Sequence, residues 1–72
     1  MRGNFLYKKL GEKIITKRKI QRISQDRLAL LSDIDRTYMA RIEKGLANPT
    51  LKVLHKIAQN LKTKISNLLK GV

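Results

Sequence analysis

The residues with the most evident chemistry lie close together in the stretch DIDRTYMARIEKG, residues 33–45. The guanidinium of Arg36 can donate two parallel hydrogen bonds to a guanine edge, and the hydroxyl of Thr37 can bond a base edge or a phosphate. Asp35, directly before them, can accept hydrogen bonds from the free amides that begin a helix. Glu43 has no partner acid or metal ligand at a useful spacing, which favours a structural role over a catalytic one. The stretch therefore indicates recognition through hydrogen bonds.

The composition of the chain favours a polyanion as its partner. Its 72 residues include 17 basic and 5 acidic side chains, which give a net charge of +12 at pH 7. That excess is larger than solubility requires, and it has the sign that attracts nucleic acid. An ordinary solvated basic surface would carry the same charge, so the organisation of the chain must decide between the two readings.

The chain lacks residues that several classes of protein need. Cysteine is absent and His55 is the single histidine, so the chain has no thiol nucleophile, no thiolate metal site and no complete catalytic triad. We therefore expect no enzymatic activity, no metal and no cofactor.

No apolar run resembles a signal peptide or the roughly 20 residues of a membrane span, which predicts a cytoplasmic protein. A membrane-surface protein fits poorly, because tryptophan is absent and the basic residues are spread over several segments.

Apolar residues recur at spacings of three and four, which predicts an all-α, compact five-helix bundle in one domain, residues 1–72. The first helix is expected over roughly residues 6–19. Ser24 and Asp35 are predicted N-caps of the second and third helices. Gly45 is predicted to end the third.

The fourth helix is expected after the cap Thr50, and a fifth over residues 65–70. The apolar positions predicted to face the core are Leu28, Ala29 and Leu31 in the second helix, Met39, Ile42 and Leu46 on the third, Leu51, Leu54, Ile57, Ala58 and Leu61 in the fourth, and Ile65, Leu68 and Leu69 in the fifth.

The second and third predicted helices and the tight turn between them, residues 24–45, have the length of a DNA-binding helix-turn-helix, about 20 residues. In this motif the N-terminal end of the second helix enters the major groove, and here that end carries Arg36 and Thr37. The expected outer stripe of this helix consists of Arg36, Thr37, Ala40, Arg41 and Lys44. A merely solvated helix face remains the alternative at this point.

The segment SQDRLALLSDIDRTYMARIEKGLANPTLKVLHKIAQNL, residues 24–61, resembles the phage-repressor (Cro-type) helix-turn-helix family. The shared pattern runs Ser-Gln-x-x-Leu-Ala, then a recognition helix ending in Glu-x-Gly, then Asn-Pro-Thr-Leu and Leu-x-x-Ile-Ala-x-x-Leu. IDRTYMARIEKG together with NPTL is most similar to the controller proteins of restriction-modification systems. The resemblance implies a lambda-repressor-like fold and a homodimeric transcriptional regulator that binds a palindromic operator in double-stranded DNA, either excluding RNA polymerase or helping to recruit it.

The resemblance also implies roles for particular residues. Base contact falls to Arg36 and Thr37, and Gln25 is expected to touch phosphate and to position the helix. Backbone contact falls to Tyr38, Arg41 and Asn48. Asp35 caps the recognition helix and can also accept from a cytosine amino group, while Arg18 is expected to pair with Glu43 and so clamp that helix against the first one.

The sequence departs from the family pattern at some positions. Arg22 and Asp33 replace glycines at two turns, and these residues adopt left-handed backbone geometry less easily, so both turns could differ in shape. Ala40 replaces a frequent serine, which removes one expected phosphate contact. Lys17 takes a position that is usually apolar.

Two further expectations concern partners. A domain this small has limited area for a core, so the apolar C-terminal residues Ile65, Leu68 and Leu69 are predicted to form a dimer interface. A rival reading is an antitoxin that also represses its own toxin-antitoxin operon. Such antitoxins usually carry an additional segment for the toxin, and little of this chain lies outside the predicted domain.

Overall fold

The protein consists of five helices around one core, and the computed structural model describes residues 3–72, with side chains from Phe5 onward. The helices are α1 (Gly3–Ile20), α2 (Gln25–Leu31), α3 (Arg36–Glu43), α4 (Leu51–Asn60) and α5 (Ile65–Leu69). The predicted all-α, five-helix architecture is confirmed for these residues, which contain no strand; residues 1–2 of the predicted domain lie outside them. The first helix begins at Gly3 rather than near residue 6.

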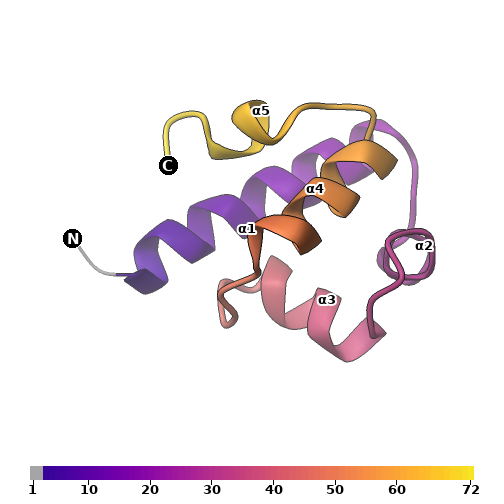
Figure 1. Ribbon diagram of the computed structural model, residues 1–72, viewed down its shortest axis with the longest axis horizontal. Helices are drawn as coiled ribbons and strands as arrows, with labels where there is room; N and C mark the ends of the chain where they lie inside the picture. The colour runs from indigo at the N-terminus through magenta and orange to yellow at the C-terminus, as the bar shows by residue number, and fades with distance from the viewer. Residues whose placement is uncertain (1–2) are drawn as a thin grey trace.

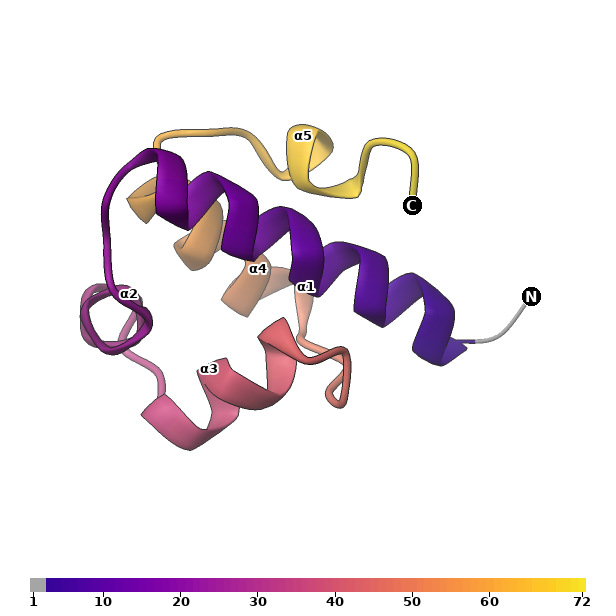
Figure 2. The same cartoon turned by 180° about the vertical axis from the view of Figure 1, so that it is seen from behind.

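The helices are arranged with α1 and α4 in the middle of the molecule (Figure 1). Below them lie α2 and α3, and α5 runs across the opposite side (Figure 2). α1 packs on both α3 and α5, while α2 packs on α3 and α4. α1 therefore separates the helix-turn-helix from the C-terminal helix.

Three helices begin at the residues that the sequence predicted. The Ser24 hydroxyl accepts a hydrogen bond from the Arg27 amide at 3.0 Å. Asp35 Oδ2 accepts from the Thr37 amide at 2.9 Å and from the Tyr38 amide at 3.4 Å. Thr50 caps α4 in the same way, through the Val53 amide at 3.1 Å. Caps of this kind each stabilise a helix by about 1 kcal/mol, which matters for helices this short.

Four helices end with the same backbone motif. In α3 the Leu46 amide donates to the Arg41 carbonyl at 2.8 Å and the Gly45 amide to the Ile42 carbonyl at 3.1 Å, a Schellman motif. α1, α2 and α4 close with the corresponding pairs of hydrogen bonds. The residues with positive φ in these motifs are Arg22 (58°), Asp33 (56°), Gly45 (76°) and Lys62 (57°).

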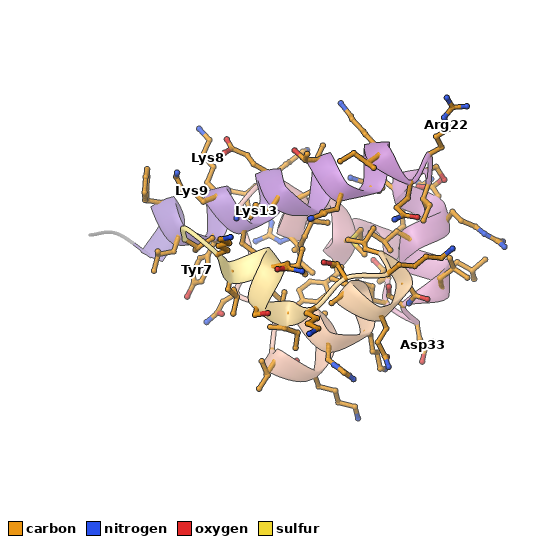
Figure 3. All side chains as sticks on the ribbon, turned by 90° about the horizontal axis from the view of Figure 1, so that it is seen from above. Tyr7, Lys8, Lys9, Lys13, Arg22 and Asp33 are labelled. Atoms are coloured by element: carbon orange, nitrogen blue, oxygen red, sulfur yellow. The ribbon has the colours of Figure 1, made fainter. Side chains whose placement is uncertain are left out.

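The turns at Arg22 and Asp33 therefore keep left-handed geometry without glycine. Both side chains point away from the protein at its periphery (Figure 3). The left-handed conformation costs such residues roughly 1 to 2 kcal/mol, which the two closing hydrogen bonds help to offset. Both turns have the left-handed geometry and the two closing hydrogen bonds of the glycine-containing turn after α3.

The core receives residues from every helix. Its buried apolar members are Leu10, Ile14, Leu28, Ala29, Met39, Ile42, Leu54, Ile57, Ala58, Leu61 and Leu68. Four leucines predicted to face inward are instead exposed: Leu31 (44%), Leu46 (58%), Leu51 (67%) and Leu69 (40%). Each stands at or beyond the end of a helix, where the periodicity of the apolar stripe no longer fixes the direction of a side chain. In α2 the buried face continues from Leu28 to Ser32, one turn further, and so bypasses Leu31.

The predicted dimer interface on α5 needs correction. Leu68 is 0% exposed and lies in the core of its own chain, so its side chain cannot face a partner. Ile65 is half-buried and packs against the same core. Leu69 alone among the three remains exposed, at 40%.

The backbones of α1 and α3 meet almost without side chains between them. A Cβ atom added to Gly11 would lie 2.4 Å from the Glu43 carbonyl oxygen, and one added to Gly45 would lie 2.5 Å from Lys8 Cα. Atoms cannot approach so closely, and backbone atoms cannot move aside as a flexible side chain can. Glycine at both positions therefore permits the contact that sets the end of α3 against α1.

We expect Gly45→Asn to lower the free energy of unfolding by about 1 to 3 kcal/mol, because the new Cβ overpacks the contact with Lys8. Asparagine adopts left-handed geometry more readily than most residues, so the substitution tests the contact rather than φ. Lys62→Asn is the matched control, since it occupies the corresponding position after α4 and already has a Cβ. Urea unfolding followed by circular dichroism measures both, and equal small losses would show that Gly45 is required only for its backbone angle.

Candidate nucleic-acid interface

The outward side of α3 is a basic surface on the face of the protein that lies away from α5 (Figure 1). Its exposed residues are Arg36, Thr37, Arg41 and Lys44, with Ala40 half-buried among them. The opposite side of the same helix buries Met39, Ile42 and Glu43. The predicted division into an inner and an outer side is thus present within the eight residues of α3.

The first turn of α3 presents the two residues predicted to contact bases. Asp35 holds the amides of Thr37 and Tyr38 through Oδ2, which fixes where the helix begins. Arg36 and Thr37 then stand exposed on this turn, while Tyr38 is half-buried and packs against the core. The helix N-terminus also carries a partial positive charge, which favours approach to phosphates.

The Arg36 side chain is held by an acid that the sequence reading did not connect to it. Its Nη1 donates to Asp26 Oδ2 at 3.1 Å. The two side chains are 71% and 61% exposed, so the ion pair contributes between zero and about 1 kcal/mol and can open easily. Asp26 lies in the first turn of α2, ten residues before Arg36, and no local pattern joins them. It restrains the guanidinium at one nitrogen and leaves Nε and Nη2 available to a ligand.

Glu43 joins three helices through its carboxylate. Arg18 of α1 donates from Nε to Oε2 at 2.8 Å and from Nη2 to Oε1 at 3.1 Å. Gln25 of α2 donates from Nε2 to Oε1 at 2.8 Å. The Arg18 guanidinium also donates from Nη1 to the Ile23 carbonyl at 3.0 Å, which ties the α1–α2 turn into the same network. The predicted pairing of Arg18 with Glu43 is present, and Gln25 takes part in positioning α3.

This network is largely shielded from water. The Glu43 side chain is 3% exposed and the Arg18 side chain 14%. A buried charge is costly unless it is paired and hydrogen-bonded, and here donors from two helices satisfy the carboxylate. The arrangement fixes the direction in which α3 presents its outer side.

The end of α3 and the loop after it carry the remaining predicted contacts. Arg41 donates from Nη2 to the Leu46 carbonyl at 2.9 Å, so it braces the start of the α3–α4 loop. Asn48 is exposed on that loop. Arg41 belongs to the outer side of α3, and Asn48 lies on the loop that follows the helix.

Other kinds of site find little support in the described part of the chain. No group of three or more histidine, cysteine or acidic side chains there could hold a metal ion. His55, the single histidine, is exposed on α4. None of the helices found in residues 3–72 is long and apolar enough to cross a bilayer.

We expect Glu43→Gln to lower the free energy of unfolding by about 3 kcal/mol, because it leaves the Arg18 charge uncompensated in a buried place. Asp26→Asn removes the carboxylate of the exposed ion pair to Arg36 and should cost less than about 1 kcal/mol. Both substitutions exchange a carboxylate for an amide of the same shape. Urea unfolding of the two variants at matched salt gives the comparison, and equal costs would contradict the role of Glu43 as a buried clamp.

Comparison with known proteins places this geometry in a family. The helix-turn-helix family pattern matches residues 14–68. Control protein C.SmaI of Serratia marcescens is 37% identical over 60 residues, which cover 83% of this chain and 71% of that protein. The crystal structure of the restriction-modification controller protein C.AhdI from Aeromonas hydrophila matches with a TM-score of 0.84 and 32% identity over 86% of this chain and 94% of that one.

The clp gene regulator ClgR from Corynebacterium glutamicum has a TM-score of 0.86 over 89% of this chain and 68% of its own, at 20% identity, which shows a common fold alone. The family match covers α2, α3 and α4 entirely, together with the clamp residues Arg18 and Glu43. The chain belongs to the helix-turn-helix family of DNA-binding transcriptional regulators and is similar to the controller proteins of restriction-modification systems.

Proposed function

We propose that the protein is a controller-type regulator that binds a palindromic operator as a homodimer, with α3 of each subunit in the major groove. The observation that carries the proposal is the exposed first turn of α3, which presents Arg36 and Thr37 while the buried side of the helix is clamped to α1 and α2. A helix of this kind reads bases from its N-terminal end.

The proposed contacts divide between bases and backbone. Arg36 bonds a guanine through the nitrogens that Asp26 leaves available, and Thr37 contacts a neighbouring base edge, a thymine methyl or a phosphate. The cap at Asp35 uses Oδ2, so Oδ1 can accept from a cytosine amino group. The residues proposed to contact the DNA backbone are Gln25, Tyr38, Arg41 and Asn48.

A second copy of the chain is proposed to cover an apolar hollow beside α5. The hollow is about 200 Å³ in volume and is lined by Leu6, Tyr7, Leu10, Asn48, Pro49, Leu54, Leu69 and Val72. None of these residues is charged, although the chain carries +12. Two such chains repel each other over most of their surfaces, and an uncharged apolar patch is where association costs least. A twofold dimer through this patch would give the symmetry that a palindrome requires.

The similarity to C.SmaI and C.AhdI supports a role in the control of restriction-modification genes. In this role the protein occupies a promoter and either blocks RNA polymerase or helps to recruit it. It needs no cofactor and performs no reaction, and it acts in the cytoplasm, where the DNA lies.

We expect Arg36→Ala to weaken binding to the operator much more than binding to random duplex, because a bidentate contact to guanine is worth about 1 to 3 kcal/mol of discrimination. Lys56→Ala is the control: it removes one charge on α4, far in sequence from the reading turn, and should weaken both slightly and about equally. Thr37→Ala should resemble Arg36→Ala with a smaller effect.

The operator for this test comes from selection of bound DNA out of a random pool. Affinities are then measured at fixed salt, after circular dichroism has verified that each variant is folded. If folded Arg36→Ala keeps the ratio of specific to non-specific affinity of the parent, α3 does not read DNA through this residue.

We expect Leu69→Asp to weaken self-association by tenfold or more, since burial of one charge in an apolar interface costs more than about 1.4 kcal/mol. Leu30→Asp is the matched control, because Leu30 is 70% exposed on α2, outside the hollow. Sedimentation equilibrium of both variants and the parent gives the dissociation constants. A parent that stays monomeric at tens of micromolar, or an equal effect of Leu30→Asp, would overturn the proposed interface.

A further inference from the structure

A second hollow lies between α1 and α5 and has a different character. Its volume is about 520 Å³, more than twice that of the apolar hollow on the other side of α5. Four lysines line it: Lys9, Lys13 and Lys17 from α1 and Lys70 from the end of the chain. The proposed DNA-binding role uses none of them.

The three lysines of α1 form a regular row. They follow one another at intervals of four residues, and a helix rises about 1.5 Å per residue, so the row has a spacing of about 6 Å. Ile20 extends the row at its end and is 70% exposed. Glu12 is the single acid in the lining.

These ammonium groups are not neutralised within the protein. Among the described residues the ion pairs join Arg18 to Glu43 and Arg36 to Asp26, and neither involves the groove. Lys9 lies over the Phe5 ring at 5.7 Å from its centre, a contact that orients the amine without removing its charge. The groove therefore presents an excess of three positive charges to solvent or to a ligand.

The groove faces away from the proposed DNA interface. Lys9 and Lys13 each stand two residues from Gly11, which meets α3, and two residues turn a helix by about 200°. Figure 3 looks onto this side, with Lys9 and Lys13 on α1 beside α5. α3 lies on the far side of α1 (Figure 2), so a duplex on α3 leaves the groove open.

We propose that this groove docks an acidic helical segment of another protein, with carboxylates at four-residue intervals and an apolar side chain that reaches Ile20. A partner helix with that spacing places its carboxylates about 6 Å apart, in register with the lysine row. Lys13 and Lys17 are half-buried in this recess, so side chains projecting from a helix reach them more readily than the backbone of a duplex does. A second copy of this chain is a poor occupant, because it carries +12 and its 5 acids include Glu12 in the groove and the buried Glu43.

The test uses the full chain without DNA and two labelled helical peptides of identical composition. One peptide has Glu at positions i, i+4 and i+8 and Leu three residues later, and the other has the same residues permuted so that the acids are scattered around the helix. Fluorescence anisotropy at about 150 mM salt, where distant charges are screened, measures binding. We expect the ordered peptide to bind more tightly than the permuted one.

Matched variants locate the site. The triple variant Lys9→Gln, Lys13→Gln, Lys17→Gln should weaken binding of the ordered peptide about tenfold, as expected for three exposed ion pairs. The triple variant Lys19→Gln, Lys56→Gln, Lys64→Gln removes the same charge outside the groove and should change it less than about twofold. Amide chemical shifts on addition of peptide should move in α1 and α5.

Other results would overturn the proposal. Equal losses in the two triple variants, or equal binding of the two peptides, would show diffuse attraction to the basic surface. Competition by random duplex that abolishes peptide binding would show that the groove takes nucleic acid instead. Shifts centred on α3 would place the peptide on the reading face. None of these results bears on the proposed DNA recognition, because the Arg36 test measures operator binding in the absence of peptide.

Discussion

The hydrogen-bonded carboxylate of Glu43 is the contact on which the orientation of α3 depends. A helix of eight residues is not stable alone, so its direction must come from what holds its inner side. Arg18 and Gln25 reach the same carboxylate from α1 and α2, and burial makes their loss costly. One acidic residue in a basic chain thereby joins α1, α2 and α3. An apolar side chain at this position would avoid the cost of burying a charge, but it could not hydrogen-bond both Arg18 and Gln25 and so fix the angle between the helices.

The second constraint on α3 is the close approach of α1. Four helices end in the same left-handed turn, yet only the turn after α3 carries glycine. Arg22, Asp33 and Lys62 show that backbone angle alone does not require it. What distinguishes Gly45 is Lys8, whose backbone would meet any Cβ there. The glycine of the Glu-x-Gly pattern is thus explained here by packing between helices more than by the turn itself.

Features that depend on neighbouring residues were predictable from the sequence itself, whereas a contact between helices was predicted only where the family resemblance supplied it. The cap at Asp35 follows from its place before a helix, and the pairing of Arg18 with Glu43 was implied by family resemblance. Leu68 was wrongly assigned to the dimer interface because the C-terminal apolar residues were assumed not to be needed in the core. The sequence does not show how much of the core the other helices leave unfilled. The ion pair of Asp26 with Arg36 joins different helices, and so does the lysine groove, which forms only because α5 folds back along α1.

The division of α3 into two sides also has an evolutionary consequence. The residues that hold the helix differ from those that face outward: Met39, Ile42 and Glu43 are buried, whereas Arg36 and Thr37 are exposed. Substitutions at exposed positions usually change stability by less than about 0.5 kcal/mol. In the proposed reading role of the outer residues, related chains can therefore acquire new target sequences by changing these residues one at a time, while every intermediate still folds.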